Sequence, residues 1–157
     1  MLKDVATLLA PELTIIGTAL AVLALDLAFP SEKRPGKKSG LVYLGLASVL
    51  IALALVVAGM SLEPREIFGG RFLINPFSGW LKVVFLLATA LTLTSGVEFL
   101  RNKAEFVTVL LLSLSGMLFL TSSRDLVLLY VSLELATLPL VALAAWKQTA
   151  RGGEAGF

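Results

Sequence analysis

Five stretches of this chain are each about as long and as apolar as a helix that crosses a lipid bilayer. Such a helix needs about 20 mostly apolar residues, because the hydrocarbon core of a bilayer is about 30 Å thick. In that core every backbone polar group must be satisfied within its own segment, which favours helices. The predicted helices cover residues 8–29, 40–60, 76–99, 105–123 and 125–146. We therefore expect an all-α membrane protein, a bundle of five transmembrane helices in one domain over 1–157, with a sixth helix starting at 152–157.

Composition supports this class of protein and excludes several others. Hydrophobic residues make up 57% of the sequence and charged residues 15%, against about 45–50% and about 25% in soluble domains. The sequence has no cysteine and no histidine, which excludes disulfides, thiolate nucleophiles and Cys- or His-based zinc, haem and iron–sulfur sites. We expect no metal, haem, flavin or nucleotide on this chain, and any redox or hydrolytic chemistry to lie on another subunit. We also expect no nucleic-acid partner, because the basic residues flank apolar runs and are not interleaved with aromatic residues.

The basic residues between the apolar runs predict an orientation. The richer side has eight and consists of Lys33, Arg34, Lys37, Lys38, Arg101, Lys103, Lys147 and Arg151; the poorer side has four, which are Lys3, Arg65, Arg71 and Arg124. The positive-inside rule places the richer side in the cytoplasm. We therefore expect a multi-pass protein of the inner (plasma) membrane whose N-terminus lies outside and whose loop at 30–39 is cytoplasmic.

The start of the third predicted helix has a specific local signal. Asn75 is a favoured N-cap residue, and Pro76 suits the first helical position because a proline there lacks only an N–H that the helix does not use. The preceding segment, 61–75, has mixed charges and the turn sequence FGG. We predict a loop there.

Glu134 is the most unusual residue in the pattern, because it lies in the middle of the last apolar run. Counted from the start of that run at about 1.5 Å per residue, it lies about 13 Å deep. An acid at that depth costs roughly 2.5–3.5 kcal/mol by insertion scales. Tyr130 and Thr137 share its helix face, and Pro139 has no N–H for the carbonyl of Leu135. We favour a protonatable site on an ion pathway, with Tyr130, Thr137 and Pro139 in support. The alternative is a neutral glutamate that hydrogen-bonds a neighbouring helix for packing.

The other ionisable residues within the apolar runs are assigned to the membrane surface. Lys82 lies about 9 Å inside its helix, and we expect its amine to snorkel outward. A cation in the first turns of a helix opposes the helix dipole, however, so a partner would stabilise it. A second hypothesis therefore pairs Lys82 with Glu134, whose depth differs from that of Lys82 by about 4–5 Å. Glu12 and Glu98 are expected to be interfacial, and Asp26 to pair with the basic loop that follows it.

Small and hydroxylated side chains predict where helices approach one another. Gly17 and Ala21 in the first helix, and Ser115 and Gly116 in the fourth, are typical of close helix packing. Thr108, Ser115 and Ser122 recur every seven residues and so share one helix face. We favour packing, with the hydroxyls bonded back to their own helix, over a face that borders a file of water.

The segment AEFVTVLLLSLSGMLFLTSSRDLVLLYVSLELATLPLVALAAWK, residues 104–147, resembles two consecutive helices of a known family. That family is the antiporter-like membrane subunits of proton-translocating NADH:quinone oxidoreductase, respiratory complex I. Among them the N-type, related to NADH dehydrogenase subunit 2, is the most similar. The marker is LELATLPLVALA, and LLAPELTIIGTALAVLALDL, NPFSGWLKVVFLLATAL and GGEAGF fit the same family.

The resemblance implies a fold of fourteen transmembrane helices with two inverted five-helix repeats, of which this chain is the N-terminal part. It implies that Glu134 pairs with a lysine on a later helix and takes part in proton translocation coupled to quinone reduction. The implied partners are the lipid bilayer and the other membrane subunits of the complex, with quinone, NADH, FMN and iron–sulfur clusters on partner subunits. Alternative hosts are an Mrp-type cation/proton antiporter or a membrane-bound hydrogenase, and another alternative is a truncated membrane scaffold that moves no ions.

Overall fold

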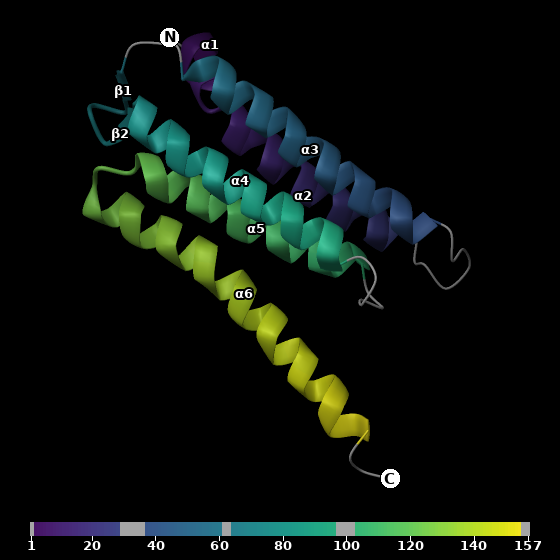
Figure 1. Cartoon of the computed structure of the whole chain (residues 1–157). Helices are drawn as coiled ribbons and strands as arrows, with labels where there is room; N and C mark the ends of the chain where they lie inside the picture. Colours follow the sequence, from purple (N-terminus) through teal and green to yellow (C-terminus); the bar gives the residue numbers. More distant parts are fainter. Residues whose placement is uncertain (1, 29–36, 61–63, 97–102, 155–157) are drawn as a thin grey trace.

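The computed structural model describes residues 2–28, 37–60, 64–96 and 103–154, and its helices run roughly parallel or antiparallel to one another (Figure 1). The helices are α1 (Leu2–Leu8), α2 (Ala10–Ala28), α3 (Lys37–Gly59), α4 (Pro76–Gly96), α5 (Lys103–Ser122) and α6 (Leu126–Glu154), and the strands are β1 (Arg65–Ile67) and β2 (Phe72–Ile74). Of the residues discussed above, Glu98 and the basic residues Lys33, Arg34 and Arg101 lie outside these ranges.

The predicted class, an all-α membrane fold, is confirmed. By length and composition, four stretches within the described residues can cross a membrane: Ala10–Ala28, Gly40–Gly59, Pro76–Ser95 and Ala104–Ser122. A shorter apolar stretch, Leu126–Ala142, forms the first part of α6 and corresponds to the fifth predicted helix. Helix α6 continues to Glu154, past the predicted end at 146. A separate sixth helix starting at 152–157 stays a prediction.

The first predicted helix, 8–29, begins earlier than expected and is interrupted. Helix α1 ends at Leu8 and α2 starts at Ala10. Pro11 accounts for the break, because it has no N–H for the carbonyl of Thr7 and its ring crowds that carbonyl. Backbone hydrogen bonds from Leu9 to Val5 and from Leu13 to Leu9 still connect the two helices.

The segment 61–75 was predicted to be a loop. It contains a β-hairpin. Strand β1 pairs antiparallel with β2, with Glu66 opposite Leu73. Phe68, Gly69 and Gly70 form the turn with positive φ angles of 55°, 67° and 84°. Glycine adopts this region without a Cβ penalty, which explains the two glycines of the FGG sequence. Each strand has only three residues, too few for an alternating pattern to be recognised in the sequence.

The hairpin packs onto one end of the bundle, where α2 and α4 begin and α5 ends; we call this the hairpin end (Figure 1). Phe72 is buried, and its ring meets that of Phe119 on α5 edge-on, with centroids 6.1 Å apart. The N–H of Arg124 donates to the carbonyl of Arg71, and the Arg124 guanidinium pairs with Glu66 at 2.6 Å on the surface. The hairpin is therefore fixed to the bundle through both backbone and side chains.

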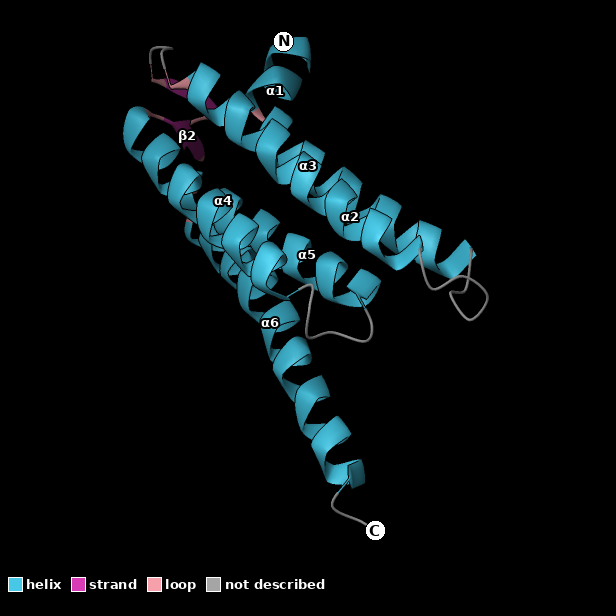
Figure 2. Cartoon of the chain, turned by 45° about the vertical axis from the view of Figure 1, so that its right-hand side comes forward, coloured by secondary structure: helices cyan, strands magenta, loops and turns pink. Residues whose placement is uncertain are grey.

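Helix α5 is the centre of the bundle and packs against α2, α3, α4 and α6. Its inward side supplies Val107, Leu111, Leu114 and Leu118 to the core. Helix α6 packs chiefly against α5 and then diverges from the other helices toward its C-terminal end (Figure 2). A large part of α6 therefore has no neighbouring helix among the described residues.

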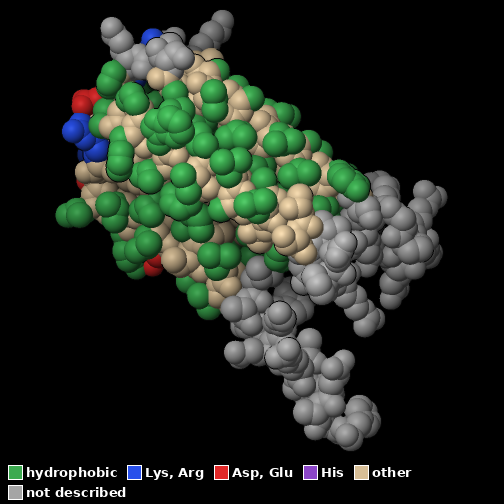
Figure 3. All heavy atoms as spheres, in the orientation of Figure 1, with side chains coloured by type: hydrophobic (Ala, Val, Ile, Leu, Met, Phe, Trp, Pro, Cys, Tyr) green, Lys and Arg blue, Asp and Glu red, His purple; other side chains and the backbone are tan. Residues whose placement is uncertain are grey.

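The exterior is apolar, as a bilayer requires. Hydrophobic side chains cover most of the described face shown in Figure 3, and the basic side chains visible there gather at the hairpin end. Exposed large hydrophobic residues occur on α2, α3, α4 and α6, with Leu20, Leu91 and Val127 among them. A surface of this kind in water would be an aggregation hazard, and in lipid it is the expected one.

Candidate functional site

Glu134 lies on the side of α6 that does not face α5. Ser132 and Ala136, two residues on either side of it, are buried, whereas Glu134 is half-buried. Tyr130 is 60% exposed and lies one helical turn before Glu134, on the same face of α6. The predicted polar face formed by Tyr130, Glu134 and Thr137 is thus present, and among the described helices no other element covers it.

Thr137 offers this polar face less hydrogen-bonding capacity than its position on the helix indicates. Its hydroxyl donates to the carbonyl of Leu133 at 2.9 Å, within the same helix. A threonine bonded in this way keeps only its acceptor capacity for another group. Tyr130 is therefore the polar side chain best placed to act on Glu134.

Helices α5 and α6 make backbone contact in the turn between Glu134 and Pro139. Pro139 lies inside α6 and provides no N–H to the carbonyl of Leu135. A Cβ added to Gly116 on α5 would lie 2.6 Å from the carbonyl carbon of Leu135, which no real side chain tolerates. Beside it, the hydroxyl of Ser113 donates to the carbonyl of Ala136. The loosened turn of α6 is therefore held against α5 by a glycine contact and an interhelical hydrogen bond.

The two glycines that were predicted to lie at close helix contacts, Gly116 and Gly17, differ in their surroundings. The predicted close contact at Gly116 is confirmed. Gly17 on α2 has open space where its Cβ would be, and it lines a surface groove of about 260 Å³ between α2 and α3. No close helix contact exists at Gly17 among the described residues, so the prediction there is wrong.

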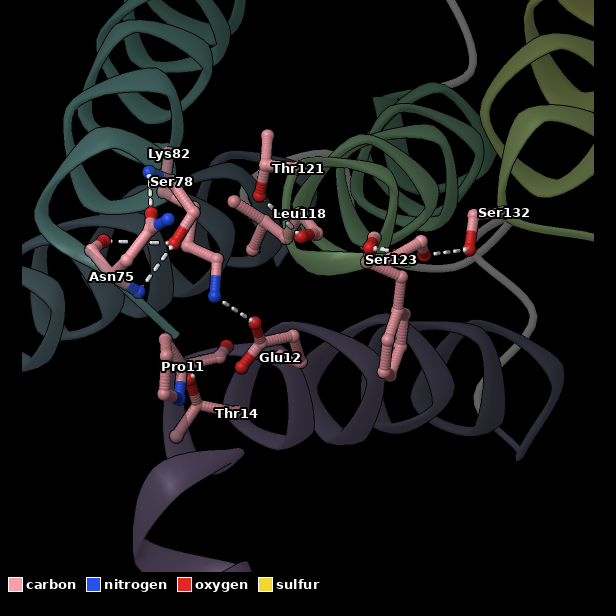
Figure 4. Close-up of polar contacts among 11 residues, drawn as sticks. Pro11, Glu12, Thr14, Asn75, Ser78, Lys82, Leu118, Thr121, Ser123 and Ser132 are labelled. Carbon is pink, nitrogen blue, oxygen red and sulfur yellow. Dashed lines mark hydrogen bonds and ion pairs between the residues drawn. The ribbon is translucent and has the colours of Figure 1, made fainter. Parts of the chain in front are cut away.

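The predictions for Lys82 and Glu12 as surface residues are also wrong. Only 3% of Lys82 and 0% of Glu12 is exposed, and Lys82 Nζ donates to Glu12 Oε1 at 2.6 Å (Figure 4). Lys82 therefore pairs with Glu12 and not with Glu134. The ammonium also lies 5.5 Å from the centroid of the Phe72 ring, within the range of a cation–π interaction.

The physical reason for this pair lies in the two helix dipoles. Glu12 occupies the first turn of α2, where the positive end of the helix stabilises an anion. Lys82 follows the start of α4 at Pro76 by less than two turns, where a cation needs a counter-charge. The expectation that a partner would stabilise Lys82 is thus met by a residue that the sequence pattern assigned to the interface. The two residues are 70 positions apart, so no local signal indicated the pair.

The hydroxyl face of α5 mostly follows the packing interpretation. Thr108, Ser115 and Ser122 are all buried. Thr108 donates to the carbonyl of Ala104 at 3.0 Å, and Ser115 to that of Leu112 at 2.6 Å. The hydroxyl of Ser122 has no hydrogen-bond partner among the described residues. Packing therefore accounts for two of the three hydroxyls.

The predicted N-cap is confirmed at the start of α4. The side-chain oxygen of Asn75 accepts from the Ser78 N–H at 2.7 Å, and the Ser78 hydroxyl lies 3.1 Å from the Asn75 N–H that donates to it. This reciprocal arrangement satisfies two backbone donors that a helix start leaves unpaired. It also fixes the part of α4 from which Lys82 reaches Glu12.

In the part of the chain that the structure describes, no three His, Cys, Asp or Glu residues are grouped so that they could hold a metal ion. The ionisable groups of interest instead form two separate places. One is Glu134 on the open face of α6, and the other is the Glu12–Lys82 pair at the hairpin end.

The chain is similar in sequence to several known proteins. No protein-family model matches the chain. NADH-quinone oxidoreductase subunit N of Moorella thermoacetica is 34% identical over 158 residues, covering 96% of this chain and 31% of that protein. The corresponding protein of Rhodospirillum rubrum is 35% identical over 145 residues, covering 88% and 30%. NADH-ubiquinone oxidoreductase chain 2 of Marchantia polymorpha is 30% identical over 147 residues, covering 89% and 30%.

A solved structure has a similar arrangement of helices. The match is to respiratory complex I from Thermus thermophilus with bound aureothin, with a TM-score of 0.72 and 25% sequence identity. It covers 87% of this chain and 29% of the matched chain. The chain thus spans about a third of the length of the relatives that it matches.

Proposed function

We propose, from the premise that the chain belongs to the family of NADH-quinone oxidoreductase subunit N and NADH-ubiquinone oxidoreductase chain 2, that it acts in the membrane arm of an NADH:quinone oxidoreductase. In this role it takes part in proton translocation coupled to quinone reduction. Glu134 is the group that takes up and releases the proton. The observation that supports this assignment is a carboxylate on the open face of α6, within its apolar stretch Leu126–Ala142.

The environment of Glu134 suits a charge that can be switched. A carboxyl in a medium of low dielectric is neutral when alone, whereas a nearby cation favours its ionised form. Glu134 has a phenol one turn away and no cation paired with it among the described residues. A basic side chain that approaches the open face from another helix would therefore change the charge of Glu134. In the proposed mechanism, that approach drives release of the proton and withdrawal drives uptake.

The contact between α5 and α6 holds Glu134 at a defined position for this exchange. Gly116 and Ser113 fix the turn of α6 that follows the acid. The turn lacks one helical hydrogen bond because of Pro139, so the carbonyl of Leu135, the residue after the acid, has no N–H partner at position 139. Polar atoms of this kind favour water beside Glu134, which an uninterrupted apolar helix would exclude.

The remaining components lie elsewhere in this proposal. Quinone, NADH, FMN and the iron–sulfur clusters bind partner subunits, and this chain binds no cofactor. Its partners are the other membrane subunits and the bilayer. The chain is a multi-pass membrane protein of the inner membrane, and we propose that its N-terminus lies outside. No specific observation favours the Mrp-type antiporter, the hydrogenase or the scaffold.

Substitution of Glu134 in the full-length subunit, within its complex, tests the proposal. We expect Glu134→Gln to preserve assembly but to impair proton translocation and the coupled quinone reductase activity. Glu134→Asp should retain part of both, because the titratable group remains. Asp125→Asn is the matched control, since it removes an acid just before α6, outside the apolar stretch. If Glu134→Gln translocates protons at the wild-type rate, the residue serves packing and the assignment fails.

A further inference from the structure

The Glu12–Lys82 pair has features that packing alone does not explain. Lys82 donates to Oε1 of Glu12, but the second carboxylate oxygen, Oε2, has no hydrogen-bond partner among the described residues. An unsatisfied buried acceptor costs free energy, and such groups usually bind water or an ion. The hydroxyl of Ser122 is also buried without a partner, and it lies at the end of α5. Two unsatisfied polar atoms thus lie in elements that meet at the hairpin end.

A small cavity lies beside Lys82, and Pro11, the residue before Glu12, also lines it, whereas Glu12 itself does not. It has a volume of about 70 Å³ and is lined in part by Lys82, Ser78, Asn75 and Arg65. One water molecule takes up about 30 Å³ in the liquid, so the cavity has room for water in contact with Lys82. Its lining combines these polar groups with apolar side chains from α2 and α3, so it extends along the ends of the helices.

We propose that Glu12 and Lys82 form a second proton-exchanging site of this protein, hydrated at the hairpin end. In the exchange, a hydronium ion transfers its proton to the free Oε2 of Glu12 and becomes water. Glu12 becomes neutral, and Lys82 keeps its proton and its positive charge. Release is the reverse step, in which Oε2 returns the proton to water.

The fold contains groups that stabilise the site both when Glu12 is ionised and when it is neutral. When Glu12 is ionised, Lys82 and the positive end of α2 stabilise the carboxylate. When Glu12 is neutral, the ring of Phe72 still faces the Lys82 ammonium at 5.5 Å. A purely structural ion pair needs support only for the first state.

Few other charges act on the site among the residues whose side chains the structure describes. Arg65 on β1 lines the cavity, and Glu66 and Arg124 form their own exposed pair at 2.6 Å. The apolar stretches of α3 and α5, 40–59 and 106–122, contain no charged residue. The site therefore works as a local unit. It requires that the chain lies in a membrane, but it does not depend on a role of Glu134 in proton transfer.

Infrared difference spectroscopy of the assembled complex in lipid tests the proposal, because a protonated carboxyl group has its own C=O stretching band. On acidification we expect a band that is lost completely in Glu12→Gln and that shifts in D₂O, since water reaches the group. The band should persist in Lys82→Arg, which keeps the cation, and weaken in Phe72→Leu. Glu134→Gln should leave it unchanged, which separates this site from the proposed function.

The absence of any acid-induced band sensitive to Glu12→Gln would mean a permanently ionised structural pair and would overturn the proposal. A band that fails to shift in D₂O would overturn it as well, because the carboxyl would then be closed to water. If Glu12→Gln does not assemble, Glu12→Asp identifies the band instead by changing its position. A spectrum of Glu12→Asp identical to that of the wild type counts against the site.

Discussion

Lys82 of α4 and Glu12 of α2 are joined by an ion pair of 2.6 Å in which at most 4% of either side chain is exposed. Neither residue lies where an isolated charge would be stable in a bilayer. Together they connect two helices that begin at the hairpin end, and Phe72 adds the hairpin to the same cluster. The pair is thus a tertiary link as well as the proposed proton-exchanging site.

Removal of one partner should destabilise the fold. We expect Lys82→Met to lower the free energy of unfolding by roughly 3–5 kcal/mol, because Glu12 is left as an unpaired buried acid. The double variant Lys82→Met with Glu12→Leu should recover most of this loss. Thermal unfolding in detergent measures both variants, and together with the single variant Glu12→Leu they complete the cycle that gives the coupling energy of the pair. Arg124→Ala, which breaks an exposed pair, is the control and should cost less than about 1 kcal/mol. Equal losses in Lys82→Met and Arg124→Ala would contradict the buried link.

Enlargement of Gly116 should separate α5 from α6. A Cβ there meets the backbone of Leu135 and Ala136, which cannot rotate away as a side chain can. We expect Gly116→Ala to cost about 1–3 kcal/mol, as for other overpacked sites. Gly17→Ala is the matched control, because its Cβ has nothing within 4 Å. Unchanged thermal stability in Gly116→Ala would show that the two helices are not in backbone contact.

The proposed orientation is testable by labelling, because the chain has no cysteine of its own. A single cysteine at Phe68, in the exposed turn of the hairpin, should react with a membrane-impermeant thiol reagent added to intact cells. A cysteine at Gly36, in the basic loop, should react only after the membrane is opened. The positive-inside rule gives this expectation. The opposite labelling pattern would place the N-terminus in the cytoplasm.

Loss of the α4 cap should have a moderate effect. Asn75→Ala removes the acceptor of the 2.7 Å bond from the Ser78 N–H, and we expect a cost of about 1 kcal/mol in the free energy of unfolding. Asn75→Ser should restore most of it, since serine is also a favoured N-cap residue. Thermal unfolding provides the measurement. A larger loss in Asn75→Ser than in Asn75→Ala would show that capping is not the function of this side chain.

The sequence by itself determined the features that depend on neighbours along the chain. Apolar length predicted the membrane helices, because the bilayer imposes that length on any spanning segment. The dipeptide Asn75-Pro76 predicted the start of α4, and the helical period placed Tyr130, Glu134 and Thr137 on one face. Pro11 was also a local signal, and the same reasoning applied to it would have predicted the break before α2.

Only the tertiary structure decided which distant residues meet. The sequence pattern assigned Lys82 and Glu12 separately to the membrane surface, and the fold buries them together. The hairpin was equally hidden, because strands of three residues gain their stability from packing Phe72 against Phe119 on α5 rather than from their own pattern. Helical period fixes the direction of a side chain from its own axis. The depth and rotation of one helix relative to another depend on packing over their whole length, and these two quantities determine whether two charges become a pair.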